Sequence, residues 1–331
     1  MPGDFPHAAT PDAGHDWALV LAAGEGSRLQ RLTTTASGVA VPKQFCSLSG
    51  GTSLLHDTLR RAQVIAPPRR TCVVVSADHR CWWQSLGRSI PGSNIVVQPR
   101  NRGTAIGILL PLLAILQRDP DAVLGVLPSD HFVRNESLLA DAMRQAMRLA
   151  RSSPTLILLG FEPEEADPEL GYIVPGPHAD LGMREVAEFV EKPDARTAGE
   201  IVRRGGLWSS FIFAVRGRSL LAMFERHMPE VVMEMTAVTQ PARCDSMHRY
   251  AQLAAVYERL PTVDFSRDIV ERYPDDLRVV SVSACGWSDL GTPRRVADVL
   301  RKERPAAPSA PATAYSSGFL DLAAQHLRLH A

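Results

Sequence analysis

The chain has 331 residues, and 45% of them are hydrophobic, which is enough for one large core or one core with a small appendage. Lys and Arg together number 36, as do Asp and Glu, so there is neither the basic excess that favours nucleic acid nor an acidic tail. The five cysteines show no Cys-x-x-Cys spacing, which argues against a zinc site or a disulfide framework and favours the cytoplasm.

The N-terminal stretch 1–16 is rich in Pro, Gly, His and Ala and is predicted to be disordered. It lacks the charged-then-apolar pattern of a signal peptide. The longest apolar run, 106–116, is interrupted by Pro111 and is shorter than the ~20 residues of a membrane helix. We therefore expect no membrane partner.

The first apolar segment, 18–22, is continuous, as in a parallel strand buried on both faces. It ends in a turn containing Gly24 and Gly26, which allow sharp backbone bending and bring N–H groups close to a ligand. Arg28 and Lys43 place two cations beside this turn. The combination indicates a polyphosphate site, and the competing interpretation is an ordinary strand-to-helix turn.

Two other phosphate motifs do not match this turn. The sequence has no Gly-x-x-x-x-Gly-Lys-Ser/Thr motif, which excludes a P-loop. The third glycine position of the dinucleotide fingerprint holds Leu29, which argues against a hydride-transfer enzyme.

Strands and helices alternate up to residue 160. The predicted strands are 18–22, 72–75, 95–97, 122–127 and 156–160, and the predicted helices are 53–65, 104–116 and 138–150. Such βαβ units predict a mostly parallel sheet in three layers. Right-handed crossovers place the strand C-termini at one edge, where ligands bind in open α/β sheets. The glycine turn, 98–104 and 129–130 all follow strand ends.

The rhythm changes after residue 160. Strands are predicted at 171–174, 185–190, 208–215 and 277–282, and helices at 197–204, 220–239, 246–257 and 293–301. We expect a nucleotide half at 17–160 and a sugar-phosphate half at 161–302. Residues 303–331 are predicted to form an Ala/Pro linker followed by a short helix at 319–329. This helix either docks on the protein or forms a homodimer contact, or it is a frayed tail.

Asp130 and Asp289 each follow a predicted strand. Two carboxylates at one sheet edge suit Mg²⁺, which neutralises phosphate charge during nucleotidyl transfer. On spacing alone, a helix N-cap is the favoured interpretation of each, because capping is the commonest role of an Asp that follows a strand. Asp78 has a similar context, and we interpret it as a cap.

Six segments together resemble the sugar-1-phosphate nucleotidylyltransferases of the mannose-1-phosphate guanylyltransferase type. They are 21–29, 42–45, 127–131, 189–194, 208–213 and 287–291, and the resemblance covers about 17–302. Residues 98–105 also resemble the segment by which this family recognises the base, called here the base-recognition segment. It implies a three-layer αβα Rossmann-like fold with a mixed, mostly parallel sheet. The absence of hexapeptide repeats excludes the C-terminal β-helix of some family members.

The resemblance also assigns roles to residues. Catalytic roles fall on Arg28, Lys43, Asp130, Lys192 and Asp289, with Asp130 and Asp289 holding Mg²⁺. Nucleotide contacts fall on Leu21, Ala22, Ala23, Gly24, Glu25, Gly26, Ser27, Arg28, Lys43, Gln98, Asn101, Arg102, Gly103, Thr104, Pro128, Ser129 and Asp130. Sugar-phosphate contacts fall on Gly171, Tyr172, Glu191, Lys192, Ser209 and Asp289.

Some of these assignments have plain structural alternatives. Arg102 is either a phosphate contact or a surface charge, and Thr104 is equally plausible as an N-cap. Glu191 and Lys192 could form an exposed ion pair at a strand end. Ser209 stands where the family usually has an Asn that contacts the sugar.

The expected function is transfer of a nucleotidyl group from an NTP, GTP foremost, to a sugar 1-phosphate, mannose 1-phosphate foremost. The products are GDP-mannose and pyrophosphate. The alternatives are another base and sugar pair, or a non-catalytic regulatory protein that binds nucleotide sugars. Such regulatory relatives tend to lose the loop cations or a metal Asp, and this chain keeps all four groups.

Overall fold

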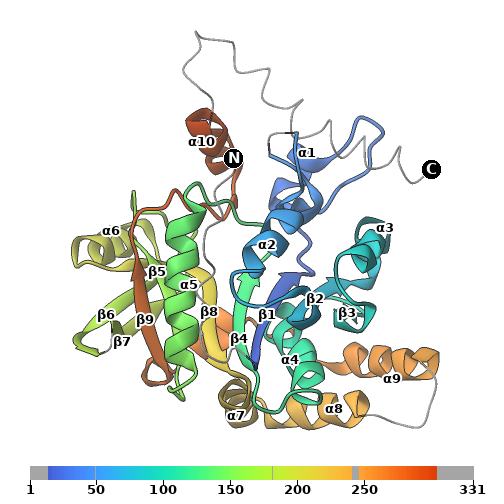
Figure 1. Cartoon of the computed structure of the whole chain (residues 1–331). Coiled ribbons are helices and arrows are strands. Elements are labelled where there is room, and N and C mark those ends of the chain that lie inside the picture. Colours follow the sequence, from blue (N-terminus) through green and yellow to red (C-terminus); the bar gives the residue numbers. More distant parts are fainter. Residues whose placement is uncertain (1–13, 49, 181, 241–245, 304–331) are drawn as a thin grey trace, which may run out of the picture.

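The structure is a computed structural model that describes residues 14–48, 50–180, 182–240 and 246–303. Over these residues the strands form one nine-stranded sheet in the order β3-β2-β1-β4-β8-β5-β9-β7-β6, with β6 also pairing with β8 (Figure 1). The strands are β1 Asp16–Ala22, β2 Thr71–Ser76, β3 Ile95–Gln98, β4 Val123–Pro128, β5 Leu156–Phe161, β6 Gly171–Asp180, β7 Met183–Val190, β8 Leu207–Arg216 and β9 Leu277–Val282.

The pairing directions confirm a mixed, mostly parallel sheet. β1 pairs in parallel with β2 and β4, β2 with β3, and β5 with β9. β7 and β8 run against their neighbours. The ends of β1, β3 and β4 therefore meet at one edge, as the alternating pattern predicted.

Within the described residues, the predicted helices are present with one exception. The helices of the structure are α1 Gln30–Thr33, α2 Leu54–Ala62, α3 Arg80–Trp83, α4 Gly103–Leu116, α5 Glu136–Ala150, α6 Ala195–Arg203, α7 Gly217–His227, α8 Pro229–Thr239, α9 Ser246–Arg259 and α10 Pro293–Glu303. The prediction of a single helix at 220–239 is wrong. The first helix ends before Met228, and a second one begins with Pro229 at the first position of α8.

Two apolar clusters fill the two faces of the sheet and make the three layers. One cluster joins the sheet to α4, α7, α8 and α9, and the other joins it to α2, α5 and α6 (Figure 1). A third, smaller cluster contains Leu29, Val41, Leu290, Val296 and Val299. It packs the segments after the glycine turn against α10, which places the start of α10 beside the site.

The termini differ in part from expectation. Asp16 begins β1 and pairs with Arg151, so it does not belong to the disordered tail expected at 1–16. The rest of that tail up to residue 13, and the linker and helix expected beyond 303, lie outside the described residues. Within the described residues no helix is long and apolar enough to cross a membrane.

Candidate functional site

The glycine turn after β1 is shaped to let another segment approach closely. Gly26 has a φ of 63°, in the left-handed region, and a Cβ there would lie 3.1 Å from the backbone N of Lys43. The Gln44 side chain donates hydrogen bonds to the carbonyl oxygens of Ala22 (3.0 Å) and Gly24 (2.9 Å). The Lys43–Gln44 segment therefore packs against the glycine turn and holds its backbone in place.

Lys43 joins the two aspartate segments. Its Nζ lies 2.8 Å from Oδ2 of Asp130 and donates a 2.6 Å hydrogen bond to the backbone oxygen of Asp289. The Lys43 side chain is only 7% exposed, so this contact is held in place by packing.

The backbone brings the two aspartates to the same place. Phe132 and Ser288 exchange backbone hydrogen bonds of 2.9 Å in each direction, and Asn135 N donates to the oxygen of Cys285. Asp130 and Asp289 flank this pairing. Neither is a helix N-cap, since Asn135 caps α5 and the Asp289 Oδ1 accepts from Gly291 N at 3.0 Å.

A cavity of about 250 Å³ opens above these groups. Its walls contain the second glycine of the turn, the two loop cations and both aspartates, and its lining is Gly26, Ser27, Arg28, Leu29, Lys43, Asp130, His131, Asp289, Leu290 and Gly291. The predicted phosphate loop and the two predicted carboxylates therefore share one cavity.

Charge in this cavity is set by close pairs. Burial raises the pKa of Asp130, but the charge and hydrogen bond of Lys43, together with His131 and a backbone hydrogen bond, outweigh burial and hold it below its usual range, so Asp130 is a carboxylate. Burial lowers the pKa of His131 to about 4, so its ring is neutral. Trp287 Nε1 donates to His131 Nδ1 at 3.3 Å, which leaves the ring proton on Nε2, the atom 3.7 Å from Asp130.

Asp289 is held by a buried arginine. Arg295, at the start of α10, donates to Oδ1 of Asp289 at 2.7 Å and through Nε to Oδ2 of Asp167 at 2.9 Å. Its side chain is 12% exposed. The next residue, Leu290, has a φ of 50°, an uncommon conformation for a non-glycine residue that functional sites often contain.

Asp130 and Asp289 are the residues of this cavity that could hold the magnesium ion expected from the sequence. Lys43 occupies one oxygen of Asp130 and Arg295 one oxygen of Asp289, so each carboxylate keeps a second oxygen outside its cation pair. No group of three or more His, Cys, Asp or Glu suited to a metal occurs within the described residues. Mg²⁺ is usually held by one or two carboxylates with phosphates and water, so two suffice.

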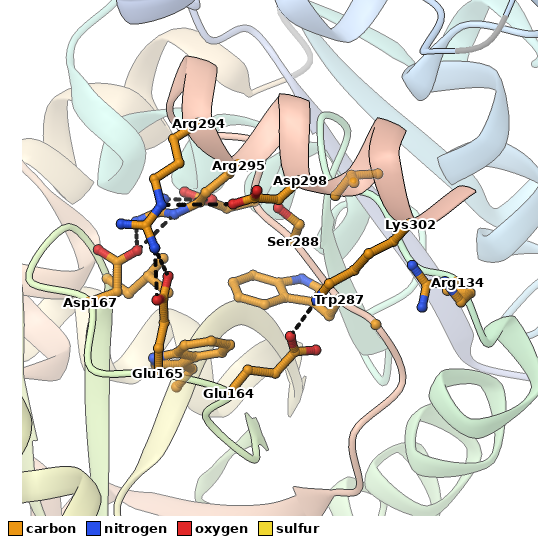
Figure 2. Close-up of a pocket in the computed structure, with 15 residues that line it drawn as sticks. Arg134, Glu164, Glu165, Asp167, Trp287, Ser288, Arg294, Arg295, Asp298 and Lys302 are labelled. Carbon is orange, nitrogen blue, oxygen red and sulfur yellow. Dashed lines mark hydrogen bonds and ion pairs between the residues drawn. The ribbon is translucent and has the colours of Figure 1, made fainter. Parts of the chain in front are cut away.

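A second cavity of about 230 Å³ lies between α10 and the acidic loop 162–170 (Figure 2). Its lining includes Trp208 and Trp287, together with several ion pairs. Arg294 pairs with Glu165 at 2.9 Å, Lys302 pairs with Glu164 at 2.6 Å, and Arg295 reaches Asp167. The cations and carboxylates are satisfied by one another, so these ion pairs tie α10 to the loop.

The acidic loop 162–170 also contacts the segment that follows the glycine turn. Arg28 Nη1 lies 3.0 Å from Oε2 of Glu169, and both side chains are about half exposed. Arg28 would have to exchange Glu169 for a phosphate, which is a small cost because exposed ion pairs contribute ~0–1 kcal/mol.

The predicted base-recognition segment is only partly open to a ligand. Asn101 is exposed, accepts from Gly103 N at 2.9 Å and donates to Glu25 at 3.1 Å. Gln98 is 2% exposed, and its side chain faces α4, with Oε1 left unpaired. Its predicted contact with a base would therefore require the side chain to turn out of the core.

Two other residues of this segment are held by neighbouring parts of the chain. Arg102 donates to the carbonyl oxygens of Tyr257 (2.6 Å) and Glu258 (2.9 Å), which end α9, so it is not a free surface charge, and its phosphate contact stays a prediction. Thr104 is not the N-cap of α4, because Arg102 holds that position and the Thr104 hydroxyl accepts from Phe265 N at 2.7 Å.

The predicted sugar-phosphate residues Gly171, Glu191, Lys192 and Ser209 gather where β6 and β8 begin and β7 ends. A Cβ on Gly171 would lie 2.7 Å from Oε2 of Glu191 and 3.4 Å from Cβ of Ser209. Lys192 Nζ is 3.2 Å from Oε1 of Glu191, whose side chain is only 11% exposed. Burial therefore raises the pKa of Glu191 even though Lys192 opposes it. The pair is not an exposed surface contact.

Tyr172 is wrong as a sugar contact. It is fully buried, and its hydroxyl bonds to the backbone of Asp167 and accepts from Trp208 Nε1. Ala22, Pro128 and Ser129 are also buried, so they support the cavity beside the glycine turn without lining it. Asp78 is not a cap either, because Ser76 accepts from Asp78 N.

Three residues with clear roles in holding the site escaped the sequence analysis. Gln44 stood inside a recognised motif, and an amide beside the glycine turn was the available signal. Arg295 and Glu169 gave no local signal, because their partners are distant in sequence.

Comparisons with known proteins agree on one family. A model described as nucleotidyl transferase matches residues 17–304. The chain is 31% identical over 279 residues to a putative mannose-1-phosphate guanylyltransferase of Vibrio cholerae serotype O1, covering 83% of this chain and 58% of that protein. It is 32% identical over 289 residues to a mannose-1-phosphate guanylyltransferase of Escherichia coli strain K12, with coverage of 83% and 58%.

A solved structure gives the same result for the fold. The Thermus thermophilus protein described as mannose-1-phosphate geranyltransferase has a TM-score of 0.72 at 27% identity, covering 87% of this chain and 79% of that one. The chain spans about 58% of the length of the two curated relatives.

Proposed function

The chain belongs to the nucleotidyl transferase family, as its motifs predicted, and from this membership we propose that it transfers a guanylyl group from GTP to mannose 1-phosphate. The products are GDP-mannose and pyrophosphate. The observation that carries this proposal is the contact of Lys43 with both Asp130 and the Asp289 backbone in the cavity below the glycine turn. Localisation in the cytoplasm and assembly into a homodimer remain predictions from the sequence.

The reaction needs no nucleophilic side chain. The second pKa of a phosphate monoester is ~6, so the sugar phosphate is largely a dianion at neutral pH. One of its oxygens forms a bond to the α-phosphorus of the nucleotide while the bond from that phosphorus to the bridging oxygen breaks. The bonding electrons leave with pyrophosphate, and the protein supplies position and charge compensation.

The cavity residues divide this work. Arg28 and the amides of the glycine turn bind the β- and γ-phosphates, and Lys43 compensates charge near the α-phosphate. Lys192 binds the incoming phosphate and Glu191 accepts hydrogen bonds from sugar hydroxyls. Asp130 and Asp289 would hold Mg²⁺, which supplies charge neutralisation at the phosphate oxygens.

The test is pyrophosphate release from a grid of NTPs and sugar 1-phosphates, with and without Mg²⁺. We expect GTP with mannose 1-phosphate to be the fastest pair and to require the metal. Release with another pair but not with this one would contradict the substrate assignment, and no release with any pair would contradict the activity.

The site itself is tested by Asp130→Asn, which keeps the shape of the side chain and removes its charge. Turnover should fall by at least about 100-fold, in line with loss of a transition-state charge contact. Asp121→Asn, an exposed aspartate outside the site, is the matched control.

A further inference from the structure

Residues 263–271 bridge two parts of the proposed site. They contact the base-recognition segment, at the N-terminus of α4, and the turn at Glu191–Lys192 that follows β7. Val263 N donates to the oxygen of Arg102 and Ala105 N donates to the oxygen of Val263, both at 3.1 Å. Phe265 N donates to the Thr104 hydroxyl. The start of this segment is therefore pinned to the N-terminus of α4.

The segment then forms a π-helical turn at Ser266–Val270, where Glu271 N donates to the oxygen of Ser266 at 2.8 Å. One extra residue in a helical turn rotates the following side chain by about 100°, and such turns are frequent at functional sites. The rotated residue here is Glu271, whose Oε1 accepts a 3.0 Å hydrogen bond from Glu191 N.

The hydrogen bond from Glu191 N to Glu271 lies next to a residue with a strained backbone conformation. Lys192, the next residue, has a φ of 51°, a left-handed conformation that a non-glycine residue keeps only where its surroundings determine it. Glu191 is held on its other side by the approach of Gly171 and by Lys192 Nζ. The carboxylate of Glu271 is thus the contact that fixes the backbone N–H immediately before the strained residue.

We propose that Glu271 is a positioning residue that holds the Glu191–Lys192 turn in the conformation that receives the sugar phosphate. The role of Lys192 in this statement rests on the proposed function. A carboxylate suits the task because a charge-assisted hydrogen bond to a backbone N–H is stronger than a neutral one.

The kinetic test compares Glu271→Ala, which removes the acceptor, with Glu271→Gln, which keeps an oxygen at the same reach. The KM for mannose 1-phosphate should rise about tenfold in E271A, the loss expected for a hydrogen bond to a charged group. The KM for GTP and kcat should stay within about twofold, and E271Q should recover most of the loss. Glu188→Ala, an exposed glutamate on β7, is the control.

A second measurement does not depend on activity. Hydrogen exchange at the Glu191 amide should become faster in E271A and stay slow in E271Q, with the unfolding midpoint of both near that of the wild type. Unchanged exchange in E271A, or equal effects of the two variants on the KM for mannose 1-phosphate, would overturn the proposal. If the wild-type protein releases no pyrophosphate, the proposed function fails while the exchange data still decide the role of Glu271.

Discussion

Lys43 and Asp130 form an ion pair of 2.8 Å although they are 87 positions apart in the chain, and the lysine is almost completely enclosed. Replacement by methionine keeps the apolar stem and removes the ammonium. We expect Lys43→Met to lower kcat/KM for pyrophosphate release by at least about 100-fold, because the site loses a fixed charge aimed at the α-phosphate. The pKa of Asp130 should rise, since Lys43 is the main group that lowers it.

Arg31→Met is the matched control for this change, because Arg31 is an exposed cation on α1, in the segment between the glycine turn and Lys43. Its effect on kcat/KM should stay within about twofold. If the two variants behaved alike, Lys43 would have no role beyond the general positive charge of the loop.

Arg294 and Arg295 are neighbours on α10 with different surroundings, and they predict different losses of stability (Figure 2). Arg295 is 12% exposed and bonds two carboxylates, so Arg295→Ala leaves Asp167 and Asp289 without their cation. We expect the free energy of unfolding to fall by about 2–4 kcal/mol. Arg294 is 73% exposed, and Arg294→Ala should cost less than ~1 kcal/mol.

Urea unfolding of both variants measures this difference. Equal losses would mean that the Arg295 pairs contribute no more than exposed ones do. The Arg295 variant should also need more Mg²⁺ for half-maximal activity, since Oδ1 of Asp289 loses the contact that orients the carboxylate.

The fold was predictable because its signals are local. Residues 18–22 are apolar without interruption, and Ser53, Asn135 and Asp194 cap α2, α5 and α6 with their own side chains. The edge where Lys43 and Asp130 meet followed from the alternation of strands and helices.

The parts that could not be predicted depend on partners distant in sequence. Whether Arg102 faces phosphate or solvent depends on the end of α9, 155 positions later in the chain, where it bonds to the Tyr257 oxygen. Tyr172 lies next to the sugar residues in sequence, yet strand alternation turns its ring into the core beside Trp208. A motif therefore locates a segment, while the packing of the core decides which of its side chains face the ligand.

Substitution by alanine should have different effects at Gly171 and at Gly103. At Gly171 we expect it to change substrate binding, and at Gly103 to change stability. A Cβ on Gly171 would meet the end of the Glu191 side chain at 2.7 Å, and that flexible end can move away. Gly171→Ala should therefore raise the KM for mannose 1-phosphate several-fold while the unfolding free energy changes by less than ~1 kcal/mol. Kinetics with each substrate varied in turn, together with urea unfolding, measure both quantities.

Gly103→Ala is the contrasting variant. Gly103 has a φ of 83°, and a Cβ there would lie 2.2 Å from the backbone oxygen of Val263, which is hydrogen-bonded and cannot move cheaply. We expect this change to cost at least about 2 kcal/mol of stability. A stable Gly103→Ala protein would show that the 263–265 segment yields easily.

Asp119 provides a pH-dependent contribution to stability far from the catalytic cavity. Its carboxylate accepts from Trp17 Nε1 at 2.8 Å and lies 2.7 Å from His15 Nδ1. Burial raises the pKa of Asp119, but these partners outweigh burial and lower it below the usual value of 3.8. Asp119→Asn should therefore reduce stability near neutral pH by about 1 kcal/mol, the usual worth of one such hydrogen bond.

The sign of the pH effect follows from where the protons bind. Because the folded pKa of Asp119 is lower than the unfolded one, the unfolded chain binds more protons between the two values. The contribution of Asp119 is complete above the unfolded pKa and is lost as the pH falls through the folded pKa. The stability gap between wild type and Asp119→Asn should thus be present at pH 7 and shrink in strong acid, with the exposed Asp121→Asn showing no such change. Urea unfolding at both pH values measures the gap, and a gap of equal size at both would mean that the Asp119 carboxylate is not selectively stabilised in the folded state.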